Sequence, residues 1–223
     1  MLKIDFDPII KEAAPEYRAL ILECNVETFP TSDNLWQLIE ELSFNIRDKY
    51  ELQDINKRDE IAALRQAYKK FGKDPNRYRP SSDALSRRIV KGMHLYRSLN
   101  IIDLINYLSV KYGNSIGGFD TDKIQGDKIT LGVGREKEPY NAIGRGELNI
   151  SGLPVWRDLA GGIGTPTSDN ERTKITPSTK RLLMTIHIFD PNSSFEEIKD
   201  ETIGLLEKYA NASSIQIALH IPS

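Results

Sequence analysis

Cysteine is scarce in this chain, and its only example is Cys24. A single thiol excludes an internal disulfide and any zinc site built on several thiolates. Cys24 lies in an apolar stretch, so we expect a buried, inert thiol rather than a nucleophile. Long apolar runs are also missing, and none approaches the roughly 18 residues of a membrane-spanning helix. The first eighteen residues contain acids and a proline, unlike the apolar core of a signal peptide, so we expect a cytoplasmic protein without membrane partners.

Motifs of metal, nucleotide and hydrolase chemistry are absent as well. The three histidines, His94, His187 and His220, are far apart, and no His-x-x-x-His pair, Walker loop or Gly-x-Ser-x-Gly elbow occurs. His187 and His220 alternate with apolar residues, which indicates hydrogen-bonded structural histidines on strands. We therefore expect no metal or cofactor, and the sequence assigns no catalytic residue.

Charge is distributed unevenly in a chain whose net charge is −2. The segment 65–97 carries ten Lys and Arg residues against two acids, whereas residues 1–60 carry seven bases and fourteen acids. This asymmetry favours an anionic partner. Within the segment, Arg77–Tyr78–Arg79 places an aromatic ring between two guanidinium groups, which suits contact with phosphates and stacking on bases. The predicted RNA-binding residues are Arg77, Arg79, Arg87 and Arg88.

Two other interpretations of the basic segment stay open. Its charges suit an ordinary solvated helix surface, or ion pairs with the acidic N-terminal region. The segment also suits a docking face for an acidic protein, including the N-terminal region of another copy.

Hydrophobic periodicity predicts an α+β fold with mostly helices in the first half and mostly strands in the second. The predicted helices cover residues 33–48, 57–71, 81–91 and 99–110, and a further one begins at a Ser194–Glu197 capping box. Eleven of the fifteen glycines fall between residues 117 and 164 and predict short strands with tight turns. The predicted strands cover residues 17–26, 128–133, 140–143, 147–150, 181–189 and 214–221. We expect residues 1–55 to form an N-terminal extension packed on a main domain of residues 56–223.

The glycine-rich run Gly161–Thr165 precedes a polar loop rather than a helix, so it is a poor candidate for a phosphate cradle. It suits instead the close approach of a ligand to the main chain. The polar run 167–173 that follows is either a solvated turn or the rim of that ligand site.

Four separated segments resemble a known family. They are GKDPNRYRPSSDALSRRIVKG from Gly72, IIDLINYLS from Ile101, IGGFDTDKIQGDKITL from Ile116, and RTKITPSTKRLL from Arg172, together with the glycine-rich run between the last two. Their order and spacing are similar to the B3/B4 domain of the phenylalanyl-tRNA synthetase beta subunit, in a free-standing form. The resemblance covers residues 60–190 and implies a B3/B4-like domain, with a glycine-rich region of short strands and flanking helices. In the synthetase, this domain hydrolyses the ester bond of tyrosine that is mischarged onto the phenylalanine tRNA.

The resemblance also implies a set of substrate-binding positions, some of which depart from the family. Asn106 matches a family asparagine, Ala160 and Gly161 match a pair whose backbone lines the amino-acid pocket, and Phe119 and Asp120 match a Phe-Asp pair. The family's histidine before that pair is replaced here by Gly117. The glutamate that recognises the tyrosine hydroxyl aligns with Thr185, so selection of tyrosine is in doubt. The substrate-binding positions implied by the resemblance are Asn106, Gly117, Asp120, Ala160, Gly161 and Thr185.

The expected function is therefore that of an RNA-associated protein that binds tRNA or hydrolyses mischarged aminoacyl-tRNA in trans. The alternative is a non-catalytic module that binds a free amino acid or a similar small molecule. The resemblance excludes synthesis of aminoacyl-tRNA, because it places no catalytic synthetase domain in this chain.

Overall fold

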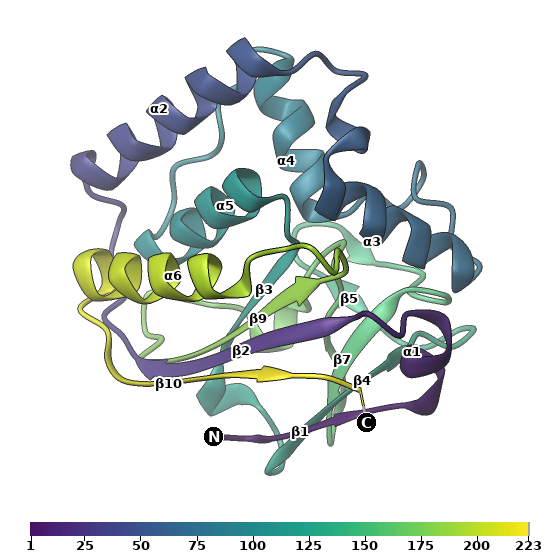
Figure 1. The fold of residues 1–223 in the computed structure, drawn as a ribbon. Coiled ribbons are helices and arrows are strands. Elements are labelled where there is room, and N and C mark those ends of the chain that lie inside the picture. Colours follow the sequence, from purple (N-terminus) through teal and green to yellow (C-terminus); the bar gives the residue numbers. More distant parts are fainter. Residues whose placement is uncertain (223) are drawn as a thin grey trace.

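A computed structural model of the chain describes residues 1–222, and their helices and strands form three layers (Figure 1). Helices cover one face of a central four-stranded sheet, and a second four-stranded sheet covers the other face. The helices are α1 (Pro8–Ala13), α2 (Asp33–Lys49), α3 (Asp59–Lys70), α4 (Ser81–Val90), α5 (Asn100–Tyr112) and α6 (Phe195–Ala210). This arrangement confirms the predicted α+β class.

The central sheet has the strand order β10-β2-β9-β3. Its strands are β2 (Arg18–Asn25), β3 (Ile116–Asp120), β9 (Arg181–Ile188) and β10 (Ser213–His220), and all neighbouring pairs are antiparallel. The second sheet has the order β1-β4-β7-β8, with β1 (Lys3–Phe6), β4 (Lys128–Val133), β7 (Pro154–Asp158) and β8 (Gly161–Gly164). A separate pair consists of β5 (Asn141–Ala142) and β6 (Gly146–Glu147). Residues 1–55 thus contribute one strand to each four-stranded sheet.

Alternation along the central strands divides the core into two parts. Leu20, Leu22 and Met184 point to the helix side, where they share one core with apolar residues of α2, α5 and α6. Ile21 and Leu183 point to the opposite side, toward apolar side chains of the second sheet and of α1 and α3. Because both faces are covered, the sheet holds the residues of β3 and β9 in a fixed register between the two cores.

Local sequence signals predict the start of α2 correctly but not the capping bonds at the start of α6. The Ser32 Oγ accepts a hydrogen bond from the Leu35 amide at 3.4 Å, which caps α2 one residue before its predicted start. The prediction of a capping box at Ser194 is wrong, because that side chain makes no capping bond and Glu197 instead accepts from the Tyr112 hydroxyl. Glu197 therefore serves the contact between α6 and α5 rather than the start of its own helix.

The buried groups with reactive side chains are structural. Cys24 is buried, and burial raises the pKa of its thiol to about 12, as the apolar surroundings predicted. His187 is buried and its Nδ1 lies 2.9 Å from the Tyr17 hydroxyl, while burial lowers its pKa to about 3. Within residues 1–222, no group of three or more potential ligands could hold a metal ion, and no helix has the length and apolarity to span a bilayer.

Candidate functional site

A cavity of about 830 Å³ lies beside the tight turn that joins β7 to β8. Two of the predicted substrate-binding residues, Ala160 and Gly161, form this turn and line the cavity. Gly161 has a φ of 127°, a conformation that side-chain-bearing residues rarely adopt. The remaining lining residues are Lys137, Glu138, Pro139, Tyr140, Asn141, Glu147, Leu148, Asn149, Gly162, Asn170 and Arg172.

Ion pairs hold the walls of this cavity in place. The Arg172 guanidinium donates to both carboxylate oxygens of Asp158 at 2.9 and 2.7 Å, and Arg157 makes an equivalent pair with Glu138 at 2.7 Å for each bond. The Tyr140 hydroxyl donates to the main-chain oxygen of Ser168 at 2.8 Å. Neutral amides, main-chain groups and the charged side chains of Lys137 and Glu147 are left to contact a ligand, an arrangement suited to binding a small polar group.

Two further predicted residues lie next to each other, but not in this cavity. Gly117 and Thr185 are cross-strand partners on β3 and β9, on the side of the central sheet that faces the second sheet. The side chain of Phe119 occupies the space beside Gly117, because a Cβ on Gly117 would lie 2.7 Å from its ring. A Cβ on Gly164 of β8 would lie 2.4 Å from the same ring. The aromatic ring thus fills the gap between the sheets that the two glycines leave.

Asp169 adds a carboxyl group to this contact between the sheets. Its Oδ2 accepts a hydrogen bond from the Gly118 amide at 3.1 Å, and its Oδ1 lies 2.8 Å from where a Cβ on Gly164 would be. Burial raises the pKa of this carboxyl to about 7, against the opposing effect of the Gly118 amide. Its neighbour in sequence, Asn170, lines the cavity.

The last two predicted residues lie elsewhere. Asn106 is on α5, a helix that packs on the other face of the central sheet, and it does not line the cavity. The Asp120 carboxylate accepts a hydrogen bond from the Thr179 hydroxyl at 2.9 Å and lies 3.4 Å from the Lys123 ammonium group. The structure therefore brings Ala160 together with Gly161, and Gly117 together with Thr185, but does not place all six residues in one pocket.

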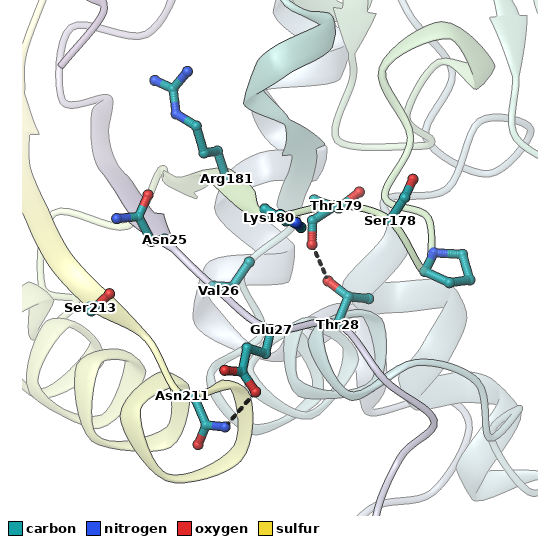
Figure 2. A pocket seen from close by; sticks show the side chains of 11 residues that line it. Asn25, Val26, Glu27, Thr28, Ser178, Thr179, Lys180, Arg181, Asn211 and Ser213 are labelled. Carbon is teal, nitrogen blue, oxygen red and sulfur yellow. Dashed lines mark hydrogen bonds between the residues drawn. The ribbon is translucent and has the colours of Figure 1, made fainter.

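A second cavity, of about 610 Å³, adjoins the segment that contains Thr179 (Figure 2). Its walls come from the end of β2, the segment before β9, and the turn between α6 and β10. Glu27 accepts a hydrogen bond from the Asn211 amide at 2.8 Å, and the Thr28 hydroxyl donates to the Thr179 main-chain oxygen at 2.7 Å. These bonds join the three segments to one another, which gives the polar groups a structural role.

The basic segment 65–97 is partly internal. Asp83 is fully buried and pairs with Arg65 Nη1 at 2.8 Å and with Arg87 Nε at 2.5 Å. Lys73 is also buried and donates to the main-chain oxygens of Asn149 and Ser151 at 2.8 and 2.6 Å. Arg87 therefore joins α4 to the core of the segment, so its guanidinium is less available to RNA than the sequence suggested.

Four cations of the segment remain on the surface near the end of α3. Lys69, Lys70, Arg77 and Arg79 are exposed, and we call this set the 69–79 surface. The Tyr78 ring between the two arginines is half-buried, and the Lys73 ammonium group lies 3.6 Å from its centroid. Because a lysine already covers this ring, the predicted base stacking on Tyr78 is not supported.

The sequence pointed to only part of the cavity wall. Asn170 and Arg172 belong to the polar run 167–173, whose role as a ligand rim was one of two interpretations, and both line the cavity. Tyr140 and Asn141 were missed as site residues, since they lie in a short predicted strand with no distinctive motif. The pairing of β5 with β6 and the bridge from Ala142 to Asn170 bring this strand to the cavity, and both are contacts of the folded chain.

Comparison with known proteins gives consistent matches. Residues 63–221 match a family model described as the B3/4 domain. The phenylalanine–tRNA ligase beta subunit of Latilactobacillus sakei is 24% identical over 134 residues, which cover 54% of this chain and 16% of that protein. The same subunit of Fusobacterium nucleatum is 26% identical over 144 residues, which cover 61% of this chain and 17% of that protein.

One solved structure aligns with 96% of this chain, and the alignment covers 50% of that structure's own chain. It is an N-terminal fragment of the phenylalanyl-tRNA synthetase beta-subunit from Pyrococcus horikoshii, with a TM-score of 0.47 and 14% identity. The chain spans about one sixth of the length of the two curated relatives described above.

Proposed function

The chain belongs to the B3/4 domain family, and on that premise we propose that it is an RNA-associated protein that binds tRNA. The curated relatives are subunits of a ligase that acts on tRNA, and they match this chain over more than half of its length. The proposal transfers to this chain an association with tRNA, and it does not transfer the synthetase reaction.

The observation that carries the proposal is the exposed 69–79 surface. Burial and pairing limit the solvent contact of Arg65, Lys73 and Arg87, yet four cations remain exposed on the 69–79 surface. Cations concentrated on one loop and one helix end, in a chain of net charge −2, provide a local site for phosphates. The free arginines also match phosphate geometry, because each guanidinium can donate two parallel hydrogen bonds.

The finer part of the proposal concerns the cavity beside Ala160 and Gly161. Its volume of about 830 Å³ is in the range of small-molecule sites, and its exposed amides suit the amino and ester groups of an aminoacyl-tRNA end. We propose that the cavity holds this end and that hydrolysis of mischarged tRNA is the reaction to test. The absence of the family's histidine and glutamate at Gly117 and Thr185 makes tyrosine a poor choice of substrate.

The binding experiment measures the anisotropy of labelled tRNA as the protein is added, at several salt concentrations. Replacing Arg77 and Arg79 together with alanine is expected to weaken binding and to reduce the salt slope by about two, one for each lost phosphate contact. A matched variant, Lys180→Ala with Lys208→Ala, removes two exposed charges elsewhere and is expected to bind as the wild type does. Equal affinities and salt slopes for the two double variants would contradict the proposed role of the 69–79 surface.

The reaction is tested separately by following the release of amino acids from a panel of mischarged tRNAs. Release faster than the spontaneous rate for any member supports hydrolysis, and Gly161→Val is expected to abolish it by closing the cavity at the turn. Spontaneous rates across the whole panel would remove hydrolysis and leave binding as the function. Calorimetric titration with free amino acids distinguishes a small-molecule module, which would bind them without tRNA.

A further inference from the structure

A shallow apolar groove of about 260 Å³ lies between α2 and the loop that joins α4 to α5. Helices α2 and α4 lie at the end of the molecule away from the second sheet (Figure 1). The groove is lined by Trp36, Ile39, Glu40, Ser43, Phe44, Arg47, Ile89, Met93, His94 and Leu95. Large apolar side chains protrude around it, since Phe44 is 62%, Met93 43% and Tyr96 74% exposed. We call this set of groove residues, with Arg88, Lys91 and Tyr96, the α2–α4 face.

Cations accompany the aromatic side chains on this face. The Arg88 guanidinium lies 4.1 Å from the centroid of the Tyr96 ring, and its Nε donates to the main-chain oxygen of His94 at 2.7 Å. That bond fixes the guanidinium over one side of the ring. Lys91 and Arg47 are exposed nearby, and Glu40 is the one carboxylate among the groove-lining residues. The face therefore combines exposed apolar side chains with cations.

An exposed ring with a fixed guanidinium on one side is a suitable platform for an unpaired base. Stacking requires a free aromatic face, and a neighbouring cation adds a phosphate contact. Tyr96 meets both conditions, whereas the Tyr78 ring is half-buried against Lys73. The basic segment 65–97 thus offers its stacking surface at its C-terminal end, not at the Arg77–Tyr78–Arg79 triplet.

We propose that the α2–α4 face binds a single-stranded stretch of RNA. One base stacks on Tyr96, further bases lie against Phe44 and Met93, and the phosphates meet Arg47, Arg88 and Lys91. The guanidinium over the Tyr96 ring, together with Arg47 and Lys91, favours a polyanion over an apolar peptide as the occupant. This inference rests on the proposed association with tRNA, and it identifies unpaired nucleotides as the part that this face recognises. Phe44 and Arg47 lie outside residues 63–221, which match the family model.

The test compares a labelled unstructured RNA strand of about 12 nucleotides with a duplex of the same length. Tyr96→Ala is expected to weaken binding of the single strand at least fivefold and to leave the duplex within twofold. Tyr96→Phe keeps the ring and is expected to bind as the wild type does, while Tyr96→Leu keeps apolar bulk and is expected to fail. Phe44→Ala is expected to weaken the same strand, and thermal melts check that each exposed substitution leaves the fold intact.

Ile9→Ala is the matched control, because this isoleucine is 45% exposed on α1, which packs on β4 of the second sheet, remote from the α2–α4 face. Wild-type affinity of both Tyr96→Ala and Phe44→Ala for the single strand would overturn the inference, and so would equal weakening by Tyr96→Ala and Tyr96→Phe. If tRNA binding still depended on Arg77 and Arg79 in that case, the proposed function would stand without this site. If the wild type bound neither tRNA nor the single strand, both proposals would fail together.

Discussion

Titration of Asp169 tests how the central sheet packs against the second sheet. Its carboxyl lies between Gly118 of β3 and Gly164 of β8, with one hydrogen bond from the Gly118 amide. Burial raises its pKa from 3.8 to about 7, so the folded protein binds a proton that the unfolded chain releases. The stability that this proton contributes is fully present below pH 3.8 and is lost as the pH rises through 7.

The size of the effect follows from the two pKa values. Each pH unit between them changes the free energy of unfolding by about 1.4 kcal/mol, so the rise from pH 5 to pH 7 accounts for about 3 kcal/mol at most. The exposed area of Asp169 is intermediate rather than negligible, so solvent screening reduces this figure. We expect the protein to lose roughly 2 kcal/mol between pH 5 and pH 8 through this one group.

Asp169→Asn removes the titration and keeps an oxygen to accept from the Gly118 amide. Urea unfolding followed by tryptophan fluorescence at pH 5, 6, 7 and 8 gives the free energy of unfolding of both proteins. The difference between variant and wild type should move in favour of the variant by roughly 2 kcal/mol over this range. The same Asp-to-Asn change at the exposed Asp48 serves as the surface control. Parallel pH profiles for wild type and Asp169→Asn would refute the buried, proton-binding carboxyl.

Two further substitutions test the scaffold around the proposed sites. Asp83→Ala leaves two partly buried guanidinium groups without their carboxylate and should cost about 3–5 kcal/mol in urea unfolding, whereas the exposed Asp74→Ala should cost less than about 1 kcal/mol. Gly164→Ala places a methyl group against the Phe119 ring and should cost about 1–3 kcal/mol of folding stability, a loss that Phe119→Leu should partly reverse. Gly204→Ala on α6 adds a methyl group that meets no neighbouring atom, so it should instead stabilise the protein by about 1 kcal/mol.

Helices α2 to α6 were predictable because their signals are local, whereas the short helix α1 was not predicted. The apolar spacing from Leu35 to Ile46 and the cap at Ser32 lie within one helix, and α2 was predicted to within one residue of its C-terminal end. Strands β7 and β8 were not predicted, because their stability comes from pairing with β4 and from contacts across the core. The glycines of β8 are explained by distant side chains, since Gly162 lies against Tyr140 and Gly164 against Phe119.

The basic segment shows the same limit for function. An Arg-Tyr-Arg triplet indicates a stacking site only if the ring is free, and whether it is free depends on Lys73. The contacts of Lys73 with Asn149 and Ser151 cross more than seventy residues of sequence, and they place its ammonium group on the Tyr78 ring. Composition therefore located the charged segment correctly, but only the tertiary structure distinguishes its internal cations from its exposed ones.

Gly117 and Thr185, the two positions at which the resemblance implies departures from the family, are cross-strand partners in the structure. A side chain at position 117 would collide with the Phe119 ring, so the glycine and the position of the ring require each other. The Thr185 hydroxyl oxygen is buried with no hydrogen-bond partner among residues 1–222, and Thr185 does not line the cavity at the turn between β7 and β8. On the proposed function, an aminoacyl group therefore enters at the turn between β7 and β8, where Ala160 and Gly161 line open space. Substitutions at that turn should then change ligand binding, whereas substitutions at Thr185 should change mainly stability.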